Sequence, residues 1–169
     1  NLKVSKLAFG NMRDAGGDPM MGNADFGVIF GVGTVVYGAS FLLNGPLTDR
    51  YGGKKAILVG AGGSALMNIV LGVFTWTMTS GSSFGAVAAE HFLVIFSAIY
   101  ALNMYFQSFG AVAVVKVNAP WFHVRERGVF GAIFGILISL GIYFAFDWGY
   151  LIVKNLPLEW VFFTPGIIL

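Results

Sequence analysis

Four long stretches of the chain contain no charged residue, and this pattern predicts membrane-spanning helices. The uncharged stretches are residues 26–43, 56–75, 92–115 and 128–146. Each is about 18 to 24 residues long, enough for an α-helix to cross roughly 30 Å of hydrocarbon. None shows the alternation of polar and apolar residues that a membrane β-strand needs, so we expect helices.

Turn-forming and capping residues set the expected ends of these helices. Asp25 is expected to cap the first one, and Pro120 marks the end of the third. The predicted fold class is all-α, a polytopic transmembrane helix bundle. Residues 1–25 are expected to hold the end of a preceding helix and an extracytoplasmic loop, residues 26–44, 56–78, 87–119 and 128–152 four transmembrane helices, and residues 153–169 a loop and the start of a further helix.

Composition supports a membrane protein and removes several other classes. The chain is 57% hydrophobic and 11% charged, whereas soluble domains are about a quarter charged. It has no cysteine, which excludes disulfides, iron–sulfur ligation and Cys-based zinc sites. No catalytic triad, paired catalytic carboxylates, phosphate loop or HExxH motif occurs, so we expect no enzyme, metal or cofactor. The net charge of +2 is too small to argue for nucleic acid.

Basic residues gather in the two loops at residues 45–55 and 121–127, which alternating helices place on one side of the membrane. The positive-inside rule makes this side cytoplasmic, so a multi-pass protein of the cytoplasmic (inner) membrane is expected. The basic residues on this side are Arg50, Lys54, Lys55, Lys116, Arg125 and Arg127. The other side carries Lys3, Lys6, Arg13 and Lys154 together with the acids Asp14, Asp18, Asp25, Glu90, Asp147 and Glu159.

The loop after the first uncharged stretch carries a family motif. Residues 45–55 read GPLTDRYGGKK. This resembles the signature between the second and third helices of the major facilitator superfamily, roughly G-x-L-x-D-R-x-G-x-K/R-K/R. The resemblance implies a secondary transporter in which this loop latches two helical halves together on the cytoplasmic side.

The residues of this loop also permit a simpler interpretation. Asp49 is able to accept hydrogen bonds from the start of the next helix or to pair with Arg50, and the glycine turn presents the lysines to lipid phosphates. Basic residues that merely mark the end of a membrane helix would explain the cations of this loop. They would not explain Gly45, Asp49 and Gly52. The predicted gating residues are Gly45, Asp49, Arg50, Gly52, Lys54, Lys55, Glu126 and Arg127.

A second stretch narrows the resemblance. Phe106-Gln107, Gly110, Lys116, Trp121-Phe122 and residues 126–128 (ERG) are similar to the fourth helix and following loop of organophosphate:phosphate antiporters. This similarity implies helices 2 to 5 of an N-terminal six-helix half, an anionic or phosphorylated solute, and a second gating ion pair from Glu126 and Arg127.

The sequence departs from that antiporter family at two functional positions. Phe41 stands where the second helix of the family carries a lysine, and Ile138 where the fifth carries a histidine. The family's phosphate-binding arginines lie on its first and seventh helices, outside this chain. The chain begins without Met and stops in an apolar run, so we expect an internal piece of a longer protein.

Polar residues inside the spans supply candidate solute contacts. Tyr100, Asn103, Gln107 and Gly110 fall within about 80° on a helical wheel, a stripe that should avoid lipid. It predicts either the wall of a central aqueous cavity or hydrogen bonds between helices. Tyr37 can reach the same cavity.

Lys116 either snorkels to the headgroups or, as the resemblance to the antiporters implies, faces the cytoplasmic mouth. The predicted solute-binding residues are Tyr37, Tyr100, Asn103, Gln107 and Lys116. Small-residue stripes at Gly60, Ser64 and Asn68 and at Gly131, Gly135 and Ser139 predict close helix contacts instead.

Three functional hypotheses follow. The first is a secondary transporter working by alternating access, whose partners are membrane lipid, the solute and the remaining helices. The second is a transporter-like membrane sensor of a sugar phosphate. The third is a structural subunit of a larger membrane complex.

Overall fold

The computed structural model describes residues 2–12, 17, 19–80 and 83–169. All long secondary-structure elements among these residues are α-helices. The expected charges at Arg13, Asp14 and Asp18 lie outside the described residues. Four helices are long and apolar enough to cross a membrane, which confirms the all-α polytopic bundle. The helices are α1 (Leu2–Phe9), α2 (Asn23–Tyr51), α3 (Gly53–Thr79), α4 (Ser83–Glu90), α5 (Phe92–Asn118), the short 3₁₀ helix η1 (Val124–Glu126), α6 (Arg127–Asn155) and α7 (Trp160–Ile168).

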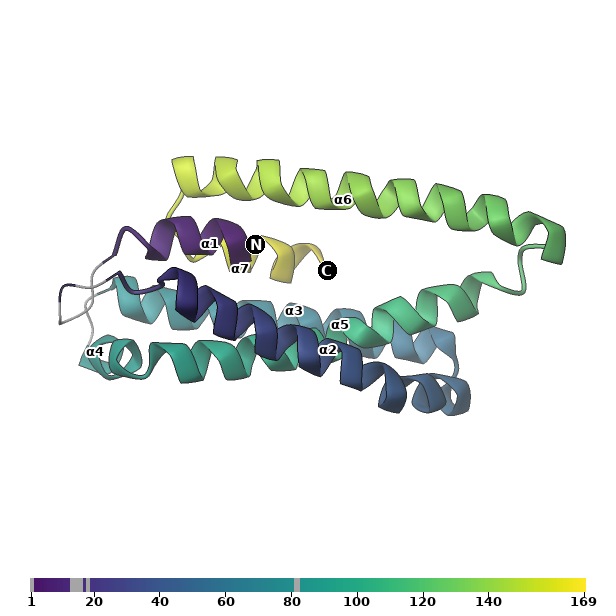
Figure 1. Ribbon diagram of the computed structural model, residues 1–169, viewed down its shortest axis with the longest axis horizontal. Coiled ribbons are helices and arrows are strands. Elements are labelled where there is room, and N and C mark those ends of the chain that lie inside the picture. Colours follow the sequence, from purple (N-terminus) through teal and green to yellow (C-terminus); the bar gives the residue numbers. More distant parts are fainter. Residues whose placement is uncertain (1, 13–16, 18, 81–82) are drawn as a thin grey trace.

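The long helices are arranged in layers. Helices α2 and α3 both pack along α5 and touch each other little. Helix α6 runs along the opposite side of the molecule, and the short helices α1 and α7 lie between α6 and the α2, α3 and α5 layer (Figure 1). Both basic connections, from α2 to α3 and from α5 to α6, lie at the same end of the molecule (Figure 1). This agrees with the alternating topology expected from the charges.

The buried core is a cluster of aromatic rings near the other end. Phe96 on α5 is fully buried, with its ring centroid 5.9 Å from that of Phe9 on α1 and 5.9 Å from that of Phe162 on α7. Edge-on packing of this kind adds about 0.5–1.5 kcal/mol per pair beyond area burial. The two short helices are therefore held to the long ones by aromatic contacts.

Polar side chains within the spans mostly bond to their own helix. The hydroxyl groups of Thr34, Ser40 and Thr75 donate to the carbonyl oxygens four residues earlier, at 2.8, 2.5 and 2.8 Å. An exception is Asn44 on α2, whose Nδ2 donates to Ser108 Oγ on α5 at 2.5 Å. Because hydrocarbon offers no partners, internal bonding is what allows these groups to enter the membrane.

Helices α3 and α5 approach closely at Gly60. A Cβ atom there would lie 3.0 Å from the backbone nitrogen of Gly110, so a larger residue would require the two backbones to move apart. Gly131 and Gly135 on α6 behave differently: no described atom would lie within 4 Å of a Cβ at either position. The close contacts predicted for these two glycines are therefore not present among the described residues, because α6 stands apart from the layer.

Some helix ends differ from those expected. Helix α2 continues through Pro46 to Tyr51 and α3 starts at Gly53, so the loop expected over residues 45–55 is reduced to Gly52. Pro46 removes one backbone hydrogen bond, which a membrane helix tolerates. The span expected over 87–119 is divided at His91 into α4 and α5. Asp25 is the third residue of α2, and its Oδ2 accepts the Gly22 N–H at 2.9 Å.

Candidate functional site

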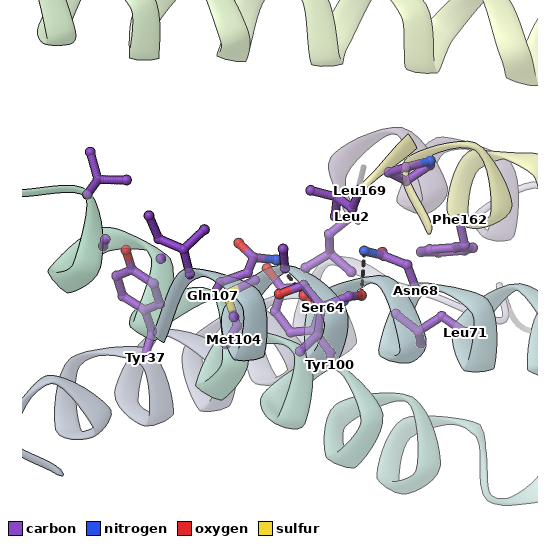
Figure 2. A pocket seen from close by; sticks show the side chains of 18 of the residues that line it. Leu2, Tyr37, Ser64, Asn68, Leu71, Tyr100, Met104, Gln107, Phe162 and Leu169 are labelled. Atoms are coloured by element: carbon purple, nitrogen blue, oxygen red, sulfur yellow. Dashed lines mark hydrogen bonds between the residues drawn. The ribbon is translucent and has the colours of Figure 1, made fainter. Parts of the chain in front are cut away.

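A groove of about 730 Å³ lies between the α3 and α5 layer and α6, and it holds most of the predicted solute-binding residues. Figure 2 shows Gln107, Ser64 and Asn68 rising from α5 and α3 toward the space beneath α6. Most of the lining is apolar, as in many small-molecule sites. The polar lining residues are Tyr37, Ser64, Asn68, Tyr100, Asn103 and Gln107.

Asn103 and Gln107 form a linked pair of amides, one turn apart on α5. The Nε2 of Gln107 donates to Oδ1 of Asn103 at 2.5 Å, and Asn103 is only 2% exposed. One amide hydrogen of Gln107 is thus used inside the protein, while its carbonyl oxygen and second amide hydrogen remain for another partner. The stripe read from the sequence faces the groove, with Gln107 as its exposed member.

Ser64 and Asn68 line the groove too, although the sequence suggested only helix contacts for them. Asn68 Nδ2 donates to the Ser64 carbonyl oxygen at 2.9 Å. Ser64 Oγ is buried and has no hydrogen-bond partner among the described residues. The available signal was their spacing of four residues, which places both side chains on one face of α3. Gly60 lies on the same face of α3 and packs on α5. Ser64 and Asn68 instead border the groove, which depends on where α6 lies and cannot be read from the sequence.

The two tyrosines reach the groove from different helices. Tyr37 on α2 lines it and has its ring edge-on to Phe41, with centroids 5.0 Å apart. Tyr100 on α5 lies against Gly33 of α2. On the same face of α2, Ser40 and Asn44 are buried. The small residues of this face of α2 therefore pack on α5, while Tyr37 reaches the groove, as the sequence predicts.

No charged side chain lines the groove among the described residues. Lys116, which was expected there, is placed elsewhere. Ile138 on α6 does line it, so the position where the antiporters carry histidine is apolar here. The groove as described offers neutral hydrogen-bonding groups on an apolar background.

The basic end of the molecule holds an ion pair between two helices. The Lys116 ammonium on α5 pairs with Oδ1 of Asp49 on α2, and the two side chains are 41% and 62% exposed. The sequence suggested Arg50 or the start of the next helix as the partner of Asp49. The pairing differs because α2 stays helical to Tyr51, which holds Asp49 beside α5 and not beside the turn.

Other residues of the signature loop occupy the last turn of α2 and the first turn of α3. The Arg50 guanidinium lies 5.7 Å from the centre of the Tyr51 ring. Gly52 has φ 86°, a left-handed conformation that favours glycine and allows one residue to join the two helices. Lys54 and Lys55 are exposed. A Cβ at Gly45 would have no described atom within 4 Å, so no other helix of the described residues approaches closely there.

Glu126 has a local role in the structure. Its Oε2 accepts the backbone N–H of His123 at 3.1 Å, which stabilises the turn before α6. Arg127 is the first residue of α6, and its side chain lies outside the described part of the structure. Among the described side chains, Glu126 forms no ion pair with residues 45–55. The second gating pair stays a prediction.

Comparison with known proteins gives a consistent result along nearly the whole chain. Residues 8–169 match the Major Facilitator Superfamily. The chain is 29% identical to the putative glycerol-3-phosphate transporter 3 of Arabidopsis thaliana over 144 residues, which cover 79% of this chain and 24% of that protein. It is 25% identical to the glycerol-3-phosphate transporter of Bacillus subtilis over 155 residues, 85% of this chain and 30% of that protein.

A third relative is named as a sensor. The chain is 24% identical to the membrane sensor protein UhpC of Salmonella typhimurium over 118 residues, 70% of this chain and 23% of that protein. The chain spans between 23% and 30% of the length of these relatives. No solved structure matches the chain.

Proposed function

The chain belongs to the major facilitator superfamily, and from this premise we propose that it serves in a secondary transporter that moves a small anionic or phosphorylated solute by alternating access. The observation that carries the proposal is the polar face of α5. Asn103 and Gln107 lie in the middle of an apolar span, and they border a groove instead of lipid. Polar groups inside a membrane are costly, so such a placement favours a solute path.

The chemistry of the groove suggests how the solute is bound. Gln107 and Tyr37 provide neutral donors and acceptors suited to hydroxyl and phosphoryl oxygens. Phe41 and Ile138 supply no positive charge, so we propose that the groove binds the polar body of the solute and that the balancing cation lies elsewhere in the transporter. Two relatives are named as glycerol-3-phosphate transporters, which makes glycerol 3-phosphate the first solute to test.

We propose that the Asp49–Lys116 pair belongs to the latch at the cytoplasmic side. The ion pair ties the end of α2 to the end of α5, beside the signature loop. In this proposal α2 and α5 belong to the same half, so the pair acts by holding the signature loop in position for its contact with the other half. The clustering of the basic connections at one end of the molecule supports a cytoplasmic location for this end, in the inner membrane.

The test is exchange transport by the intact protein in proteoliposomes loaded with phosphate. We expect uptake of labelled glycerol 3-phosphate, and we expect Gln107→Leu to raise the KM between about twofold and tenfold, the range for one lost hydrogen bond. Thr34→Val is the matched control, because Thr34 is an exposed polar residue of a span that bonds only its own helix in the described structure. Equal loss in both variants would remove the groove assignment.

A second candidate is a membrane sensor, favoured by the similarity to UhpC. A sensor would bind the solute in the same groove without passing it across the membrane. Saturable binding of glycerol 3-phosphate together with no exchange above empty liposomes would establish this candidate and exclude the transporter. Rapid exchange would exclude the sensor.

A further inference from the structure

A second, smaller groove lies between α2 and α3 at the basic end of the molecule. Its volume is about 350 Å³, and it shares no lining residue with the larger groove. Helices α2 and α3 form its walls, because both pack on α5 but hardly touch each other, and Phe109 of α5 contributes to its floor. The lining residues are Leu47, Tyr51, Lys55, Ala56, Val59 and Phe109.

This groove combines an apolar interior with a positively charged mouth. Its walls are almost entirely apolar, and the Lys55 stem and the Tyr51 ring contribute to them. Arg50 lies over the same tyrosine ring, 5.7 Å from its centre. Asp49, the neighbouring acid, pairs with Lys116, and no other ion pair occurs among the described residues of this region. The cations at the mouth are therefore free to bind an anion.

The backbone at the mouth also favours a phosphate. Helix α3 starts directly after Gly52, and no side chain caps its N-terminus. The first N–H groups of a helix lack partners within the helix and carry a partial positive charge. Lys55 lies in this first turn and lines the groove, so a basic residue and the uncapped N–H groups belong to the same turn of α3.

We propose that this groove binds an anionic phospholipid, with an acyl chain between α2 and α3 and the phosphate at Lys55 and the N-terminus of α3. The lining supports a lipid chain, because an apolar space of about 350 Å³ with Lys55 among its lining residues matches part of an acyl chain beside a phosphate. Val59 is 48% exposed, so the groove opens sideways, as a lipid requires.

Charge complementarity favours the anionic class. Zwitterionic lipids offer the same chains but no net charge, whereas a basic residue near the membrane surface adds about 1 kcal/mol of attraction for anionic lipid. The site would therefore retain phosphatidylglycerol in preference to phosphatidylcholine. The proposal of an anionic phospholipid in the smaller groove does not depend on which solute the protein transports.

The test is native mass spectrometry of the intact protein, purified from bilayers with equal parts of phosphatidylglycerol and phosphatidylcholine. We expect the wild type to retain phosphatidylglycerol, and Lys55→Gln to reduce this retention about fivefold. The matched control is Lys54→Gln, which removes the same charge from the neighbouring residue outside the groove, and we expect it to reduce retention less than about twofold. An equal loss in both variants would show only a diffuse attraction and would overturn the proposal.

Two tryptophan substitutions test whether an acyl chain of the lipid occupies the groove between α2 and α3. Val59→Trp should block the groove and remove retention of both lipids, whereas Leu58→Trp, at a neighbouring exposed position that does not line the groove, should leave retention unchanged. Unchanged retention in Val59→Trp would exclude the groove. Loss of phosphatidylglycerol on addition of inorganic phosphate would assign the cations to a soluble anion and would also overturn the proposal. Because exchange transport is measured separately, failure here is distinguishable from failure of the proposed function.

Discussion

The ion pair between Asp49 and Lys116 provides the sharpest test of the latch. Both side chains are partly exposed, at 62% and 41%, so neutralising one leaves the other in contact with water and not buried alone. The pair is therefore worth about 0.2–1 kcal/mol, the range for exposed pairs, and not the several kcal/mol of a buried one. At the upper limit, loss of the pair shifts a conformational equilibrium about fivefold.

Exchange transport in proteoliposomes measures this shift through a double-mutant cycle. We expect Asp49→Asn and Lys116→Gln each to lower the exchange rate up to about fivefold. The double variant should be no slower than either single variant, because only one interaction is lost. Arg125→Gln is the control, since Arg125 is an exposed cation at the same end of the molecule that forms no ion pair among the described residues. Exchanging the two charges, with Asp49→Lys and Lys116→Asp together, should restore most of the rate.

Ionic strength gives an independent measurement of the same pair. Raising salt from 0.15 M to 1 M shortens the screening length from about 8 Å to 3 Å, so the wild-type rate should fall toward that of the variants. The exchange rate of the double variant should change less with salt than the wild-type rate, because the double variant has no ion pair to screen. The reasoning is refuted if Lys116→Gln leaves the exchange rate unchanged while Asp49→Asn lowers it, or if the two losses multiply, because Asp49 would then act through a different partner.

Three further predictions test the fold and topology. Gly60→Leu should destabilise the protein by about 1–3 kcal/mol in thermal unfolding because it forces α3 from α5, whereas Gly62→Leu, where a Cβ has no described neighbour within 4 Å, should not. Asn44→Leu should cost about 0.6–2 kcal/mol in the same measurement, by removing its hydrogen bonds to α5. Single cysteines at Lys54 and Arg125 should both react with an impermeant maleimide from the same side of the membrane, and reaction from opposite sides would contradict the fold.

The sequence contains enough information to predict the helices but not their exact contacts. Uncharged stretches locate the spans because an unpaired charge is expensive in lipid, and this holds whatever the neighbours are. Helix ends are less determined. Pro46 and the glycines around it look like a loop, but lipid and neighbouring helices stabilise a helix through Pro46 to Tyr51.

The candidate site could be predicted only in part. Asn103 and Gln107 are recognisable because a polar stripe on an apolar helix must face something other than lipid. Ser64 could not be assigned, because a serine in a membrane helix serves packing as readily as binding and the choice depends on which helix lies opposite. Lys116 illustrates the same limit: its position near the membrane surface was predictable, but its partner depends on how α2 and α5 cross.

The distribution of charge at the basic end connects the latch with the lipid site. Asp49 is the single acid in residues 45–55, and these residues carry three cations. By pairing with Lys116 across to α5, Asp49 neutralises a charge that lies farther along the chain and leaves Arg50, Lys54 and Lys55 uncompensated. Had Asp49 paired with Arg50, the net charge of this end would be the same, but α2 and α5 would lose their electrostatic link. The same pairing that joins two helices therefore keeps the mouth of the smaller groove positive, so Asp49→Asn should weaken the latch while leaving anionic lipid in place.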